Sequence, residues 1–283
     1  MTRYGSPMTQ SDKAAAFRRL HEGPGTFVIP NPWDAGTARI LADLGFEALA
    51  TTSSGYGYSI GRRDGVGAVT RDQAVRGATV IVQATPLPVS ADLENCFGDD
   101  PETVAETIRM AAEVGLVGGS IEDSTTRPDD PIYPREQAIE RVAAAVEAAR
   151  SLPFPFTLTA RAENFLHGRP DLDDTIARLL AFEAAGADVL YAPGLSTIEQ
   201  VRTVCEAVSR PVNVLAGRQF TVAELADAGV RRVSLGGALA RAAFSAFLTA
   251  AREVRERGSF TYVDGAVPSA EIASFMAGRS EGG

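Results

Sequence analysis

The sequence predicts a (β/α)₈ barrel, because strand and helix patterns alternate steadily along its 283 residues. Most of the expected strands are short apolar runs, which is typical of a parallel sheet buried on both faces. Eight such runs occur, and a helical segment follows each of them, as in this barrel. A doubly wound open sheet is the alternative. It is weakened because no glycine-rich nucleotide motif follows the first strand.

The elements follow one another in a regular order. Strands are expected at 26–30, 48–52, 88–92, 117–121, 156–160, 188–191, 211–215 and 231–235. Helices are expected at 10–22, 34–44, 70–84, 100–115, 134–150, 173–185, 196–208, 221–229 and 238–257. Capping boxes are expected at Thr70–Gln73, Ser196–Glu199 and Thr221–Glu224. After the second strand we expect a long polar loop, since glycines stand at 55, 57, 61, 65 and 67.

The chain is expected to form one domain, residues 1–283, with the barrel at about 24–257 and a C-terminal extension at about 258–283. Within the extension, a short helical pattern begins at Pro268 and reaches Met276. We expect this segment to pack on a neighbouring subunit. The alternative is a frayed terminus.

Composition restricts the partners. The net charge of −9 and the pI of about 4.9 disfavour nucleic acid and anionic membranes. Two cysteines, Cys96 and Cys205, provide neither a disulfide framework nor zinc spacing. No membrane-spanning run is present, and the polar segment from Met1 to Asp12 lacks an apolar signal core, so a cytoplasmic location is expected. A small anionic substrate remains compatible with local arginines or a metal.

Polar residues follow the predicted strands at one end of the barrel, where barrel active sites lie. They are Thr51, Thr52, Ser53, Ser54 and Gly55 after the second strand, Asp92 and Glu94 after the third, Glu122 and Asp123 after the fourth, Arg161, Glu163 and Asn164 after the fifth, Asn213 in the seventh, and Gly236 and Gly237 after the eighth. This convergence is a stronger signal than any single motif.

The residue types indicate a hard cation beside an anion site. Asp92, Glu94 and Glu122 would repel one another without a cation, and oxygen ligands favour Mg²⁺ or Mn²⁺. Arg161 offers a bidentate fork for a carboxylate or phosphonate. The hydroxyl and N–H groups from Ser53 to Gly55 suit a second carboxylate. A cation and an arginine together would stabilise an enolate.

Structural roles compete with these functional ones. Asp92 could instead cap a turn. Glu94 or Glu122 could instead pair with a structural arginine, and Arg161 is the candidate for that arginine. Asp123 is more typical of a turn residue than of a ligand. Trp33 is more typical of a side chain that closes the end of the barrel than of one that stacks on a substrate. Cys205 has the spacing of a packed helix residue. Carboxylates near Cys96 would raise the pKa of its thiol.

The order of motifs resembles the isocitrate lyase/phosphoenolpyruvate mutase superfamily over roughly Asn31 to Arg255. The stretches that carry the resemblance are Asn31-Pro32-Trp33-Asp34-Ala35-Gly36, Thr51-Thr52-Ser53-Ser54-Gly55, Arg63-Asp64, Ser90-Ala91-Asp92-Leu93-Glu94, Ser120-Ile121-Glu122-Asp123 and Thr159-Ala160-Arg161-Ala162-Glu163. The resemblance implies Mg²⁺ at Asp92, with Asp64, Glu94 and Glu122 in its outer shell, and substrate at Arg161 and the Ser53–Gly55 loop. It also implies cleavage or formation of C–C or P–C bonds next to 2-oxo or 2-hydroxy acids, and tetramers that exchange C-terminal helices.

The chain departs from the family pattern in informative places. Lyases of the family carry a Lys-Lys-Cys-Gly-His loop after the fourth strand, whereas residues 124–131 here read Ser-Thr-Thr-Arg-Pro-Asp-Asp-Pro. Glu94 stands in place of a second Asp, and Cys96 in place of a Gly. The end of the sixth strand, residues 192–194, lacks the usual acid. Cleavage of isocitrate or methylisocitrate by the family mechanism is therefore not expected.

The leading hypothesis is a Mg²⁺-dependent lyase that cleaves a C–C bond in a small 2-oxo or 2-hydroxy carboxylate. Its proton donor would be Tyr56 or Tyr58, and loop 124–133, with Arg127 or Tyr133, would close over the substrate. The predicted catalytic residues are Arg161, Asp64, Glu122 and Tyr56, and the predicted substrate-binding residues are Thr52, Ser53, Ser54, Gly55, Trp33, Arg161 and Asn213. P–C bond chemistry and a non-catalytic binder of 2-oxo acids are the alternatives. A homo-oligomer, dimer or tetramer, is expected.

Overall fold

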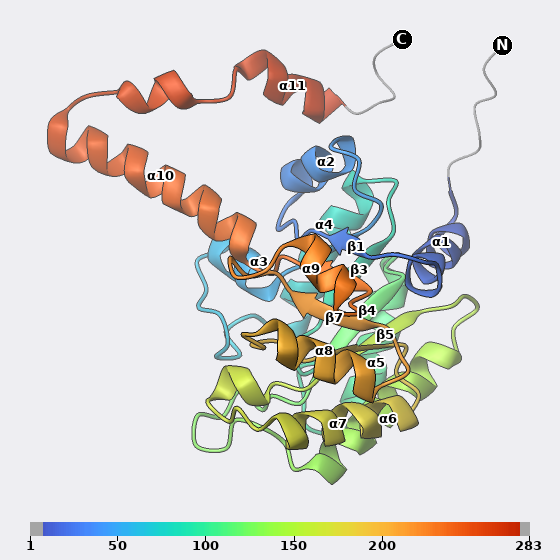
Figure 1. Cartoon of the computed structure of the whole chain (residues 1–283). Coiled ribbons are helices and arrows are strands. Elements are labelled where there is room, and N and C mark those ends of the chain that lie inside the picture. Colours follow the sequence, from blue (N-terminus) through green and yellow to red (C-terminus); the bar gives the residue numbers. More distant parts are fainter. Residues whose placement is uncertain (1–7, 278–283) are drawn as a thin grey trace.

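The computed structural model describes residues 8–277 and has eight parallel strands arranged as a barrel (Figure 1). The strands are β1 (Phe27–Ile29), β2 (Leu49–Ala50), β3 (Val89–Asp92), β4 (Gly118–Glu122), β5 (Thr157–Arg161), β6 (Val189–Tyr191), β7 (Val212–Leu215) and β8 (Arg232–Ser234). Their order is β1-β8-β7-β6-β5-β4-β3-β2, and all the pairs are parallel. The predicted fold class is confirmed.

The barrel closes between its first two strands through few backbone contacts. β1 pairs with β8, with Phe27 opposite Arg232. On the other side of β1, the Ala50 N–H of β2 donates to the Pro30 carbonyl at 3.1 Å. Short strands end together at one rim, so residues distant in sequence meet there.

Helices surround the sheet, and most of them bury an apolar face against it. They are α1 (Gln10–Glu22), α2 (Ala35–Asp43), α3 (Ser53–Ser59), α4 (Arg71–Ala84), α5 (Pro101–Glu113), α6 (Arg135–Arg150), α7 (Leu172–Ala184), α8 (Ile198–Ala207), α9 (Val222–Asp227), α10 (Ala238–Arg257) and α11 (Ser269–Ala277), with 3₁₀ turns at Asn164–His167 and Thr261–Gly265. In α5, for example, Val104, Ile108 and Ala111 recur at helical spacing and are fully buried.

One α-helix was not expected. Residues 53–59 form α3, where glycines predicted a loop. Thr52 caps this helix, because its hydroxyl accepts from the Gly55 N–H at 3.3 Å. The glycines fit close packing instead: a Cβ at Gly55 would lie 3.2 Å from the Cβ of Ala240. Tertiary contacts here override the low helix propensity of glycine.

The capping predictions hold at two of three helices. Thr70 with Gln73, and Thr221 with Glu224, form capping boxes as predicted. At α8 the box is Thr197 with Gln200, one residue later than predicted, because Thr197 rather than Ser196 adopts the N-cap position. Within residues 8–277, no helix combines the length and apolarity needed to cross a bilayer.

The C-terminal segment leaves the barrel. Figure 1 shows α10 running outward from the barrel and α11 turning back above α2. The Arg39 guanidinium of α2 donates to the Met276 carbonyl of α11, and the Met276 side chain lies 3.6 Å from the place of a Cβ on Gly36. The segment therefore forms the predicted short helix and packs on its own chain.

Candidate active site at the carboxyl ends of the strands

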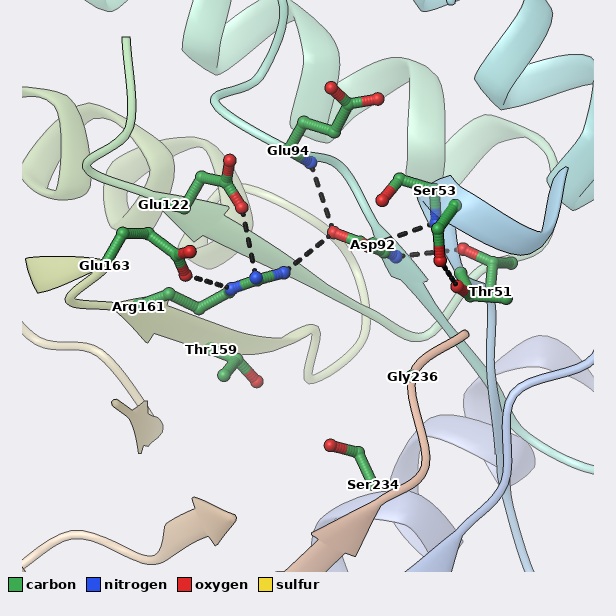
Figure 2. A network of polar contacts seen from close by, with 12 residues as sticks. Thr51, Ser53, Asp92, Glu94, Glu122, Thr159, Arg161, Glu163, Ser234 and Gly236 are labelled. Carbon is green, nitrogen blue, oxygen red and sulfur yellow. Dashed lines mark hydrogen bonds and ion pairs between the residues drawn. The ribbon is translucent and has the colours of Figure 1, made fainter. Parts of the chain in front are cut away.

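Arg161 at the end of β5 is the centre of the site, and three carboxylates surround it. Its guanidinium lies 3.0 Å from Asp92 of β3, 3.3 Å from Glu122 of β4 and 2.8 Å from Glu163, measured between nitrogen and oxygen. Figure 2 shows these carboxylates turned toward the guanidinium. The parallel register places Glu122 directly opposite Arg161. The strand ends thus bring together the predicted acids and the predicted arginine.

Burial gives this cluster unusual electrostatics. Desolvation raises the pKa of Glu122 well above its ordinary value, although Arg161 opposes the rise. For Arg161, burial lowers the pKa, but Glu163, Glu122 and Asp92 outweigh burial and raise it. The guanidinium is therefore a fixed positive charge. Because three acids share it, the cluster keeps an excess of carboxylates.

Asp92 is oriented by hydrogen bonds from two neighbouring segments. One carboxylate oxygen accepts from the Ser53 N–H at 3.1 Å, and the other accepts from Arg161. The Asp92 N–H donates to the Thr51 hydroxyl at 2.9 Å. The start of α3 and the end of β3 are thereby locked together (Figure 2). The expected contact between the Ser53 segment and the acidic strand end exists.

A second group of acids lies on the other side of Asp92. Burial, followed by the charges of Asp92 and Asp64, raises the pKa of Glu94 to about 7. Burial and Asp92 also raise the pKa of Asp64. In the described part of the chain, no three His, Cys, Asp or Glu side chains converge closely enough to hold an ion directly. Mg²⁺ usually keeps several waters, so acids that disfavour one another's charge fit a hydrated divalent cation.

The segment after β3 is strained. Glu94, Cys96 and Phe97 have φ angles of 48°, 58° and 61°, in the left-handed region that costs a non-glycine residue about 1–3 kcal/mol. The buried Arg141 guanidinium donates to the carbonyls of Asn95 and Gly98 and so holds the turn. The φ of Cys96 explains why a glycine suits this position. Its thiol is no nucleophile, because burial raises its pKa to about 12.

A cavity of about 270 Å³ opens beside the cluster. The predicted site residues that line it are Thr52, Ser53, Ser54, Asp64, Asp92, Arg161 and Asn213. The predicted residues that do not line it are Gly55, Trp33, Tyr56, Glu94 and Glu122. Glu122 instead holds Arg161, and Glu94 reaches a neighbouring groove between 67–72 and 125–127.

Both tyrosines considered as proton donors lie outside the cavity. The Tyr56 ring packs on α4, where a Cβ at Gly77 would lie 2.4 Å from it. It lines a small separate space of about 20 Å³ next to Asp92 and Glu94. Tyr58 is exposed and meets the Phe244 ring edge to face. Trp33 is half-buried, and its Cβ lies 3.2 Å from the place of a Cβ on Gly55.

The loop at 124–133 is anchored to the barrel rim. Tyr133 is fully buried, its hydroxyl donates to Asp99, and the Arg141 guanidinium lies 4.2 Å from its ring centre. Arg127 pairs with Asp99 at 2.8 Å. Neither residue lines the cavity. Asp123 has the structural role favoured for it: it accepts from Arg178 at 3.0 Å and from the Glu163 N–H at 2.8 Å.

Four chemically important cavity residues were not predicted: Tyr191 of β6, Arg232 and Ser234 of β8, and Arg241 of α10. Tyr191 lies in an apolar run, and its ring centre is 5.0 Å from the Arg161 guanidinium carbon. Arg232 and Ser234 are two residues apart and therefore point to the same face of the strand. This two-residue spacing was the feature of the sequence that could have predicted both residues at the site.

Comparisons with known proteins agree with this geometry. The family model described as phosphoenolpyruvate phosphomutase matches residues 17–255. A crystal structure from Burkholderia cenocepacia J2315 is 60% identical with a TM-score of 0.92, covering 96% of this chain and 98% of that one. A 2,3-dimethylmalate lyase of Eubacterium barkeri is 30% identical, covering 69% of this chain and 68% of the relative. An oxaloacetate decarboxylase of Pseudomonas putida strain GB-1 is 27% identical, covering 84% and 83%.

These matches include a lyase, a decarboxylase and a mutase family model, and the family model spans most of the chain. The chain belongs to the phosphoenolpyruvate mutase/isocitrate lyase superfamily.

Proposed function

We propose that the protein is a Mg²⁺-dependent lyase that cleaves a C–C bond in a small 2-oxo or 2-hydroxy carboxylate through an enolate. The observation that carries the proposal is the fixed Arg161 charge at a cavity of about 270 Å³, next to the acids Asp92 and Asp64. A cavity of this size suits a small molecule rather than a polymer. The 2,3-dimethylmalate lyase and oxaloacetate decarboxylase relatives agree with this reaction class.

The roles follow from charge. Asp92 would bind the cation, with Asp64, Glu94 and Glu122 reaching its waters. Bound there, a divalent cation would polarise the oxygen that becomes the enolate oxygen. Arg161 would hold the substrate carboxylate, and Ser53 and Ser54 would donate hydrogen bonds to a second one. Glu122 and Glu163 would keep Arg161 fixed between them.

The test is a panel of 2-oxo and 2-hydroxy acids, assayed with Mg²⁺ for release of pyruvate, glyoxylate and CO₂. Substituting Asp92→Ala is expected to abolish metal-dependent turnover, and Asp227→Ala, at an exposed position of α9, is the matched control. Full activity of Asp92→Ala would contradict the assignment of the cation site.

P–C bond chemistry is the second candidate, supported by the phosphoenolpyruvate phosphomutase family model and by further cationic residues at the cavity, Arg232 and Arg241. A phosphonate carries more negative charge than a carboxylate and gains more from these groups. Phosphorus NMR with phosphonopyruvate separates the two reactions. Loss of the phosphonate signal would favour this candidate over the lyase.

We also propose that the protein forms a homo-oligomer through α10. This helix is exposed along most of its length, with Phe247 70%, Leu248 45% and Phe244 40% accessible. Such a concentration of exposed apolar side chains is typical of an interface. Light scattering is expected to give a mass above one chain, and Phe247→Asp to lower it. A monomeric wild type would contradict this part of the proposal.

A further inference from the structure

The half of the cavity formed by β6, β7 and β8 contains a hydrogen-bonded chain that starts on a buried arginine. Arg232 is 6% exposed, and none of the ion pairs among the described residues includes it. Burial lowers its pKa to about 10, so the guanidinium is still charged at neutral pH. A buried charge without a counter-ion is costly, and its neutral partners must each present an acceptor.

Because each neutral partner must present an acceptor to Arg232, the direction of each hydrogen bond is determined. Its Nη2 donates to the Thr159 hydroxyl at 3.0 Å, and Nη1 faces the His21 Nε2 at 3.3 Å. Burial, then Arg232, lowers the pKa of His21 to about 3, so this ring is neutral. Its Nδ1–H donates to the Phe17 carbonyl at 2.8 Å, which leaves Nε2 as the acceptor.

The same logic sets the next three groups. Arg232 Nε donates to Asn213 Oδ1 at 2.8 Å, so the amide Nδ2 must face the other way. Nδ2 donates to the Ser234 hydroxyl oxygen at 3.0 Å. That oxygen has accepted one bond, and its own hydrogen can turn toward Tyr191, whose side chain lines the same cavity. Each bond therefore runs from the arginine toward the Ser234 hydroxyl, which lies at the same cavity as Tyr191.

The Tyr191 hydroxyl, at the same cavity as the end of this chain, has a hydrogen to give. The Tyr191 side chain lines the cavity beside Arg161 and Asp92, and its ring centre lies 5.0 Å from the Arg161 guanidinium carbon. Burial raises the pKa of Tyr191 to about 12, so the phenol stays protonated in the resting enzyme. Both tyrosines suggested by the sequence lie outside this cavity.

We propose that Tyr191 is the proton donor to the enolate, and that Ser234, Asn213 and Arg232 are positioning residues that aim its hydroxyl into the cavity. This inference deepens the proposed function and rests on it. In the step, the phenolic O–H bond breaks and its electron pair stays on the tyrosine oxygen. The enolate π pair forms the new C–H bond at C3 while the C2 carbonyl re-forms. Water then returns a proton to the phenolate.

The experiment is exchange of the pyruvate methyl hydrogens in D₂O with Mg²⁺, followed by proton NMR, because this exchange passes through the same enolate in reverse. Tyr191→Phe keeps the ring and is expected to slow exchange by about 100-fold or more, as for a general acid–base group. Tyr262→Phe, on the exposed C-terminal segment, is the matched control and should exchange at the wild-type rate.

A second pair of variants tests the positioning role. Ser234→Ala removes the hydroxyl that directs Tyr191 and is expected to slow exchange by about tenfold with little change in pyruvate KM. Ser234→Thr retains the hydroxyl and should restore most of the rate. Equal loss in both variants would mean that Ser234 acts only through packing, and would overturn its positioning role.

Oxalate binding, measured by calorimetry with Mg²⁺, distinguishes failure of the donor role from failure of the proposed function. Wild-type exchange that Tyr191→Phe leaves unchanged would overturn the donor role alone. A loss of exchange in Tyr56→Phe but not in Tyr191→Phe would do the same. Oxalate binding without wild-type exchange would also overturn it. Absence of both exchange and oxalate binding would overturn the proposed function together with the donor role.

Discussion

Each half of the barrel mouth contains an arginine with little exposure to solvent, and the two halves differ in how they compensate its charge. On the β3–β5 side, Arg161 is enclosed by the carboxylates of Asp92, Glu122 and Glu163. On the β7–β8 side, the hydrogen-bond partners of Arg232 among residues 8–277 are neutral acceptors. The first half therefore carries excess negative charge and the second excess positive charge, with the cavity between them.

This difference suggests a division of labour. An acidic half suits a cation, with Arg161 beside it for the substrate carboxylate, while a half with an uncompensated guanidinium and hydroxyl groups suits the enolate end of the substrate and proton transfer. A cation would compensate the excess negative charge of the acidic half, and an anion in the cavity would compensate the excess positive charge of the other half. The binding of each ligand should therefore favour the binding of the other. A substitution in one half should therefore change the free energy of unfolding by a different amount from the same kind of substitution in the other half.

The largest effect is expected from Arg161→Met. This change leaves three mostly buried carboxylates without their cation and should lower the free energy of unfolding by about 3–5 kcal/mol. Urea denaturation measures it. Arg127→Met, which removes an exposed pair with Asp99, is the control and should cost below about 1 kcal/mol. Equal losses would show that the carboxylates around Arg161 do not depend on it.

A pH-dependent effect of about 3 kcal/mol is expected from Glu94, whose pKa rises from 4.5 to about 7 on folding. The folded state holds this proton to higher pH than the unfolded chain does. In EDTA, the stability of the wild type relative to Glu94→Gln should therefore fall between about pH 4.5 and 7 and stay level above. A difference that is constant over this range would contradict the account, and added Mg²⁺ should reduce the fall.

The smallest effect is expected in the cationic half. Thr159→Val keeps the shape of the side chain but removes one acceptor of Arg232, at a cost of about 1–2 kcal/mol. Thr203→Val, on the exposed face of α8, is the matched control and should stay within about 0.5 kcal/mol. If Thr159→Val costs as little as the control, Arg232 is satisfied by its other partners.

Sequence patterns predicted the acidic half far better than the other. Asp92, Glu122 and Arg161 are polar residues that directly follow apolar strand runs, so the barrel rule brings them together. Tyr191 ends an apolar strand and resembles a core residue. Arg232 begins a strand, next to Arg231, and resembles a solvated charge. Its inward direction depends on the register with Asn213, which the sequence alone does not state.

The fold was predictable for a related reason. Alternation of strand and helix patterns is a local property, and eight repeats leave few ways to close a sheet. The helix at 53–59 was not predictable, because its glycines fit neighbours far away in the sequence, such as Ala240. Likewise, the separation of Tyr56 from the cavity follows from its packing on Gly77, a contact between two helices.

The most direct test of the divided site is the affinity of oxalate, a planar dianion that resembles the pyruvate enolate, measured by calorimetry with and without Mg²⁺. If cation and anion bind in adjoining halves, saturating Mg²⁺ should tighten oxalate binding by at least about tenfold, and oxalate should tighten Mg²⁺ binding equally. Oxalate affinity that is the same with Mg²⁺ and with EDTA would contradict the account.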